Sequence, residues 1–138
     1  MADDVLGPNG LCFAPDESLL YVVESRAVPH RKILAYDVTA NGRELRNKRV
    51  LIDAGPGGTP DGMRCDIDGN LWCGWGMGTE ELDGVVVFAP DGTPIGRIAL
   101  PERCANVCFG GLHRNRLFMA ASQSLYALYV NTQGVQGG

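Results

Sequence analysis

The sequence predicts an all-β fold built from short antiparallel strands. Glycine and proline (Gly 19, Pro 8) make up about one in five of the 138 residues and recur at short intervals, which separates strands rather than helices. Between them lie short segments rich in Val, Leu, Ile, Tyr, Phe and Trp, the residues that strands favour. No window of twelve residues shows a helical repeat of apolar positions.

Eleven strands are expected, each bounded by Gly, Pro, Asp or Asn. In chain order they cover residues 11–14, 19–24, 32–37, 48–52, 63–67, 71–74, 84–89, 95–100, 107–110, 116–121 and 125–130. The Asn41-Gly42 pair favours a hairpin turn before the fourth strand. The residues after 130 form a polar, glycine-rich tail that shows no packing pattern.

The strands repeat, with units that begin at Asn9, Asp61 and Asn106. These starts are 52 and 45 residues apart, and a leucine-aromatic pair follows each of them after 10 to 12 residues. Units of four short strands at this period are typical of β-propeller blades. We therefore expect three blades, over 1–56, 57–103 and 104–138, the third with only three strands. Because propellers have roughly four to eight blades, this chain is not expected to close one alone.

Charge and hydropathy exclude several function classes. Lys+Arg 12 against Asp+Glu 16 gives net charge −4, so no nucleic-acid partner is expected. The longest apolar runs are about five residues, too short for a membrane span. The acidic N-terminus lacks the pattern of a signal peptide, which predicts a cytoplasmic location. The five cysteines show no Cys-x-x-Cys spacing and are expected to be reduced and buried, with zinc binding as the alternative.

Three segments carry a resemblance to a known family. Residues 7–16 (GPNGLCFAPD), 60–72 (PDGMRCDIDGNLW) and 106–111 (NVCFGG) resemble, in order and spacing, three hallmark motifs of the gluconolactonase family, also called the SMP-30 or regucalcin-like family. The resemblance implies about three of the six blades of a gluconolactonase-type propeller, namely its C-terminal half. It also implies metal-dependent hydrolysis of sugar lactones.

The resemblance assigns roles to two residues. It makes Asn9 a metal ligand and Asp61 both a metal ligand and the catalytic general base. The family's third protein ligand, a glutamate, and its substrate-clamping arginine and asparagine have no counterpart in this chain.

The repeat pattern points to the same place. Asn9, Asp61 and Asn106 occupy equivalent positions of three units, which radial symmetry brings to one rim of a channel. Carboxylate and carboxamide oxygens suit calcium, with magnesium, manganese or zinc as alternatives. We expect Asn106 and Trp75 to contact substrate. The structural alternatives are a turn at Asn9 and Asp61, a strand-start cap at Asn106, and a core position for Trp75.

Two functions from different classes follow. The first is a lactonase that acts on a small-molecule lactone when a partner or dimerisation completes it, and that produces a sugar acid in carbohydrate metabolism. The alternative is a non-catalytic half-propeller that serves as an assembly or binding module. In both cases the chain is expected to self-associate or to bind a companion N-terminal half, because three blades leave apolar faces open on both sides.

Overall fold

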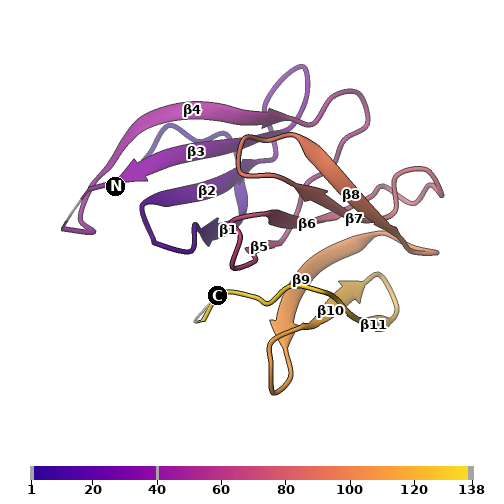
Figure 1. Ribbon diagram of the computed structural model, residues 1–138. Coiled ribbons are helices and arrows are strands. Elements are labelled where there is room, and N and C mark those ends of the chain that lie inside the picture. Colours follow the sequence, from indigo (N-terminus) through magenta and orange to yellow (C-terminus); the bar gives the residue numbers. More distant parts are fainter. Residues whose placement is uncertain (1, 40, 137–138) are drawn as a thin grey trace.

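The computed structural model describes residues 2–39 and 41–136, whose regular structure is entirely β-strand (Figure 1). The strands form three antiparallel sheets of four, four and three strands. Within each sheet, strands that follow one another in the chain are hydrogen-bonded neighbours. No helix in this described part is long and apolar enough to cross a membrane.

The strand bounds follow the chain order. The first sheet comprises β1 (Pro8–Phe13), β2 (Leu19–Glu24), β3 (Lys32–Val38) and β4 (Leu45–Asp53). The second comprises β5 (Met63–Cys65), β6 (Leu71–Trp75), β7 (Gly84–Phe88) and β8 (Pro94–Ala99). The third comprises β9 (Cys104–Gly110), β10 (Arg116–Ala121) and β11 (Leu125–Tyr129).

The eleven predicted strands are confirmed, with shifted ends. β1, β4 and β9 begin earlier than expected, because backbone pairing continues through residues 8–10, 45–47 and 104–106, most of which have polar or small side chains. β5 ends at Cys65 rather than residue 67. The reason is that Asp66, the next residue, turns its side chain back onto the following loop.

The first strand of each sheet lies toward the middle of the molecule. β1, β5 and β9 lie side by side there, and β4 and β8 lie farther out (Figure 1). This is the arrangement of successive propeller blades. It places the beginnings of the three repeat units next to one another.

Two apolar interfaces hold the sheets together. Between the first and second sheets the fully buried side chains include Val23, Ile33, Met63 and Leu71. Between the second and third sheets they are Val85, Val107, Leu117 and Met119. Both interfaces bury alternate residues of their strands, so each sheet is apolar on the faces that meet.

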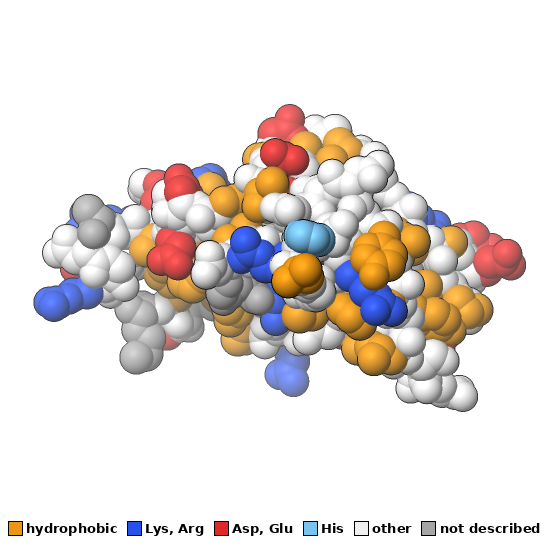
Figure 2. All heavy atoms as spheres, turned by 60° about the horizontal axis from the view of Figure 1, so that its bottom comes forward, with side chains coloured by type: hydrophobic (Ala, Val, Ile, Leu, Met, Phe, Trp, Pro, Cys, Tyr) orange, Lys and Arg blue, Asp and Glu red, His pale blue; other side chains and the backbone are white. Residues whose placement is uncertain are grey.

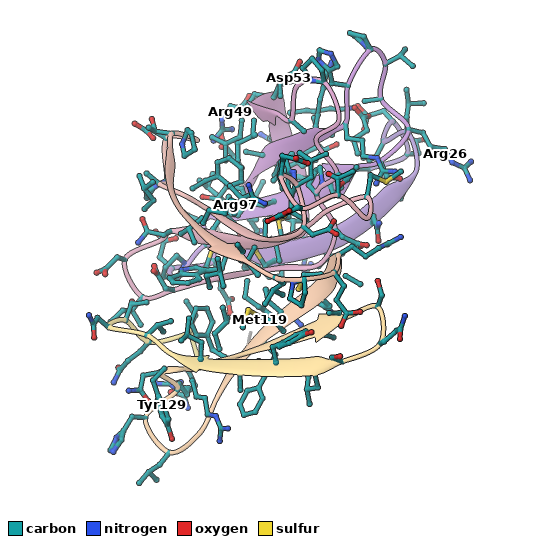
Figure 3. The ribbon with its side chains drawn as sticks, turned by 90° about the vertical axis from the view of Figure 1, so that its right-hand side faces the viewer. Arg26, Arg49, Asp53, Arg97, Met119 and Tyr129 are labelled. Carbon is teal, nitrogen blue, oxygen red and sulfur yellow. The ribbon has the colours of Figure 1, made fainter. Side chains whose placement is uncertain are left out.

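The outer faces of the first and third sheets differ in how far their apolar side chains are covered. On the first sheet, Val22, Leu34 and Tyr36 are buried because Ala2 and Val5 pack over them. On the third sheet, Leu125 and Tyr129 are exposed, and Figure 2 shows hydrophobic side chains gathered on the corresponding side of the molecule. Figure 3 shows Met119 of the same sheet pointing toward the second sheet, whereas Tyr129 lies away from it. The expected open face is therefore present at the third sheet and partly covered at the first.

The C-terminal tail packs against β5, although its sequence shows no packing pattern. The Ile67 N–H donates to the Gln133 carbonyl at 2.9 Å, and the Val135 N–H donates to the Cys65 carbonyl at 3.3 Å. Gly134 between them is buried against Phe109. These contacts use the backbone, which a search for apolar side-chain patterns does not detect.

Asp66 ties the turn of the second sheet to β6. Its side chain is buried, with residue exposure of 1%. Oδ1 accepts hydrogen bonds from the Asp68 and Asn70 N–H groups at 3.0 and 2.9 Å. Oδ2 accepts from Asn70 Nδ2 and from Trp72 Nε1, both at 2.9 Å. Four donors therefore compensate the burial of this carboxylate.

We expect Asp66→Ala to lower the free energy of unfolding by about 3 kcal/mol, because it leaves buried donors without an acceptor. Urea unfolding followed by tryptophan fluorescence measures the change. The matched control is Asp68→Ala, since Asp68 is exposed in the same turn; it should change stability by less than about 0.5 kcal/mol. Equal effects of the two substitutions would show that the buried hydrogen bonds are not the cause.

Candidate functional site

Glycines bring the beginnings of the three sheets into contact. A Cβ atom on Gly10 of β1 would lie 2.0 Å from the carbonyl oxygen of Asp61, and one on Gly62 would lie 2.1 Å from Oδ1 of Asn106. One backbone hydrogen bond strengthens the second contact, since the Gly62 N–H donates to the Ala105 carbonyl at 2.9 Å. Only glycine allows an approach this close.

The structure places Asn9, Asp61 and Asn106 on neighbouring segments at this junction. Asn9 lies in β1 directly before Gly10, and its side chain is exposed. Asp61 lies between β1 and β9, two residues before β5, with a side chain that is 22% exposed. Asn106 lies in β9, where its Oδ1 accepts a hydrogen bond from the Val107 N–H at 2.9 Å. One carboxylate and two carboxamides therefore stand at one end of the inner strands.

Trp75 lies in a different environment. It is buried between the first and second sheets, with its ring centroid 5.7 Å from that of Phe88. It lines a cavity of about 440 Å³ whose wall includes Asp53 and Arg97, labelled in Figure 3, but none of the three residues above. Its role as a substrate contact stays a prediction. Its packing against Phe88 also makes it part of the core between the first two sheets.

Arg103 is a site residue that the sequence analysis missed. Its Nη2 lies 3.6 Å from Oδ2 of Asp61, and its side chain is about half exposed. The loop around it is anchored, because the Ser122 N–H donates to the Arg103 carbonyl at 3.2 Å. The sequence signal was its place just before the third repeat unit, although an isolated arginine in a loop does not reveal its partner. The structure thus puts a cation beside the candidate catalytic carboxylate.

Two cysteines lie near Asp61 and remain thiols. Burial raises the pKa of Cys73 to about 12, and the negative charge of Asp61 adds to the shift. Burial likewise raises the pKa of Cys104 to about 11. Since a thiolate is the form that binds metals or attacks carbon, neither cysteine is ready for such chemistry at neutral pH.

The side-chain oxygen atoms at this junction are of the type that binds a hard divalent cation. Asp61 offers a carboxylate, whose contact with a cation within the described residues is the Arg103 ion pair at 3.6 Å. Asn9 adds a carboxamide, the second oxygen type that calcium and magnesium prefer. Within residues 2–39 and 41–136, no group of three or more His, Cys, Asp or Glu could hold a metal. A complete coordination shell would therefore include water or oxygen atoms from another segment.

Family comparison gives a direct match. Residues 1–123 match the family model described as SMP-30/Gluconolactonase/LRE-like region. A gluconolactonase of Zymomonas mobilis is 37% identical over 136 residues, which cover 92% of this chain and 36% of that protein. A 6-deoxy-6-sulfogluconolactonase of Pseudomonas putida is 32% identical over 127 residues, which cover 89% of this chain and 40% of that protein.

Solved structures agree with these relatives. A gluconolactonase from Xanthomonas campestris superposes with a TM-score of 0.77 at 35% identity, covering 94% of this chain and 39% of that one. A calcium-binding protein, regucalcin, from Agrobacterium tumefaciens superposes with a TM-score of 0.77 at 25% identity, covering 95% and 48%. The chain thus spans less than half the length of these proteins. The predicted fold class, an all-β part of a six-bladed propeller, is confirmed.

We expect Gly10→Ala to destabilise the chain by roughly 1–3 kcal/mol, because the new methyl group would overlap the Asp61 carbonyl oxygen. The control is Gly96→Ala in β8, where a Cβ atom would meet only Val87 at 3.8 Å, an ordinary contact. Urea unfolding compares the two variants. A Gly10 variant as stable as the Gly96 variant would mean that β1 can move away from Asp61 at little cost.

Proposed function

Because the chain belongs to the SMP-30/gluconolactonase/LRE-like family, we propose that it takes part in the hydrolysis of sugar lactones to sugar acids, as the C-terminal half of a larger propeller. The observation that carries the proposal is the junction of the inner strands, which holds Asp61 beside the Asn9 segment. The proposal keeps the three blades at 1–56, 57–103 and 104–138.

In this proposal Asp61 is the general base. Its carboxylate is partly buried yet open to solvent, so it can accept the proton of a water molecule as that water attacks the lactone carbonyl carbon. A carboxylate needs an acceptor position free for this task, and the Arg103 contact at 3.6 Å leaves one among the residues that the structure describes. The ring oxygen then leaves the tetrahedral carbon and takes the proton from Asp61, and the new carboxylic acid loses its proton to solvent, so the product carries a carboxylate and a hydroxyl group.

Asn9 and Asp61 would hold the divalent metal, with calcium as the proposed ion. The support is the chemistry of the two donors, since oxygen ligands suit calcium, and magnesium, manganese or zinc remain the alternatives. When bound, a divalent cation supplies Lewis acidity that polarises the lactone carbonyl. Asn106 and Trp75 stay proposed substrate contacts.

Arg103 has a task of its own in the proposal. Its guanidinium group stands beside Asp61 and is half exposed, so it can orient that carboxylate and donate hydrogen bonds to an oxygen of the substrate. Hydrolysis turns a neutral lactone into a carboxylate, and arginine binds carboxylates well. Negative charge therefore develops where a cation already stands.

A second candidate function is a binding or assembly module without activity of its own. It is favoured by the open apolar face of the third sheet, which includes Phe118, Leu125 and Tyr129. That sheet also has three strands where the others have four, so the edge of β11 is free to pair within the described chain. A second copy of this chain or a companion N-terminal half would cover both features.

The test of the lactonase proposal is Asp61→Asn. We expect it to abolish calcium binding measured by calorimetry and to slow glucono-lactone hydrolysis by at least about 100-fold, because the amide cannot take a proton. The control is Asp68→Asn, an exposed residue of the β5–β6 turn that should keep both properties. Hydrolysis by Asp61→Asn at the unsubstituted rate would remove Asp61 from the mechanism. A chain that shows neither calcium binding nor hydrolysis would favour the second candidate function.

For association, we expect light scattering at micromolar concentration to give a mass well above 14.8 kDa. Tyr129→Lys on the open face should shift the chain toward the monomer. The control is Ile95→Lys, because Ile95 is also exposed but lies on β8 of the second sheet. A monodisperse 14.8 kDa species that unfolds cooperatively would contradict the expected association.

A further inference from the structure

Two buried cysteines from different sheets are in contact. Cys12 lies on β1 and Cys65 on β5, with residue exposures of 7% and 4%. Their sulfur atoms are 3.9 Å apart. A disulfide bond needs about 2.05 Å, so the two sulfurs would have to approach each other by about 2 Å.

A cavity gives small molecules access to this pair. It has a volume of about 290 Å³, and its wall includes both cysteines together with Leu11, Arg64 and Val135. The C-terminal tail forms part of the wall through Val135 and Gln136. An oxidant the size of hydrogen peroxide fits in this space easily, so burial of the side chains does not seal them.

The other cysteines are arranged differently. The Cys73 thiol donates to the Gly74 carbonyl at 3.5 Å, and the Cys104 thiol donates to the Asn106 carbonyl at 3.3 Å. Cys108 is exposed on the open face of the third sheet. Among the residues that the structure describes, only Cys12 and Cys65 have a sulfur–sulfur contact.

We propose that Cys12 and Cys65 form an intramolecular disulfide when the chain is treated with a hydroperoxide, and that this bond links the first two sheets at their inner strands. One thiol loses its proton and the thiolate attacks a peroxide oxygen, so the O–O bond breaks, a sulfenic acid forms, and the departing hydroxide takes up that proton and leaves as water. The second thiol attacks that sulfur, the S–O bond breaks, and a second water leaves. Two thiols are oxidised by two electrons and one hydrogen peroxide is reduced to two waters.

The position of the bond gives it a consequence for the site. Cys12 follows Asn9 on β1, and Cys65 follows Asp61 on the segment that enters β5. The disulfide would therefore fix the separation of the two strands that lead to Asn9 and Asp61. Its formation does not depend on the lactonase proposal, because it follows from the sulfur contact and the cavity alone.

The surroundings of Cys65 also affect the rate at which the disulfide forms. The hydrogen bond with Cys12 and burial raise the pKa of the Cys65 thiol, so little of it is thiolate at neutral pH. Because the thiolate is the form that reacts with peroxide, attack by Cys65 should be slow at pH 7 and should quicken as the pH rises.

The experiment uses Cys108→Ser as the starting chain, which removes the exposed thiol and prevents cross-linking between chains. We expect hydrogen peroxide to lower the mass by two hydrogen atoms, to remove two of the four remaining thiols, and to give a linked peptide that contains Cys12 and Cys65. The oxidised chain should also unfold at higher urea concentration than the reduced one. Peptide mapping of the unsubstituted chain gives the same linkage without any variant.

Two controls make the result specific. Adding Cys12→Ser should prevent the mass change, whereas adding Cys73→Ser should leave it intact. Peroxide treatment in urea should distribute disulfides among all cysteines, because the contact exists only in the folded chain. The proposal is overturned if the folded chain keeps all its thiols, links other cysteines, or oxidises Cys12 and Cys65 separately to sulfinic or sulfonic acids.

Discussion

Close backbone contact between β1, β5 and β9 is the constraint on which the rest of the structure depends. Gly10, Gly62 and Gly74 stand where a Cβ atom would lie 2.0 to 2.7 Å from an oxygen atom of the neighbouring strand or loop. Each contact joins the inner part of one sheet to the next. Because these glycines have no side chain, the sheets can converge at their first strands and spread apart at their last (Figure 1).

The close approach of the three inner strands determines the electrostatic environment of Asp61. Asp61 is drawn into a junction whose near neighbours are the backbone of β1 and β9, the two protonated thiols of Cys73 and Cys104, and one cation, Arg103. A carboxylate with so few donors keeps most of its oxygen lone pairs available. The packing that builds the fold therefore also produces the partly buried carboxylate that the proposed roles of Asp61 require.

The strand pattern was predictable because it is local. Short apolar runs bounded by Gly, Pro, Asp and Asn identified all eleven strands, and the repeat of Asn9, Asp61 and Asn106 identified which strands are equivalent. The same pattern failed at the C-terminal tail. Residues 133–135 dock on β5 through backbone groups, which every residue has and which no composition reveals.

The sequence by itself therefore determined the all-β class, the strand order and the candidate site residues Asn9, Asp61 and Asn106. The reason is that apolar runs, turn residues and repeat spacing can all be seen in the order of residues. Only the tertiary structure decided that Arg103 faces Asp61, that Trp75 packs against Phe88, and that the sulfurs of Cys12 and Cys65 touch. Each of these pairs joins residues that are 13 to 53 positions apart. The physical reason is that such contacts depend on how the sheets pack, and packing is set by the fit of whole faces rather than by any local pattern.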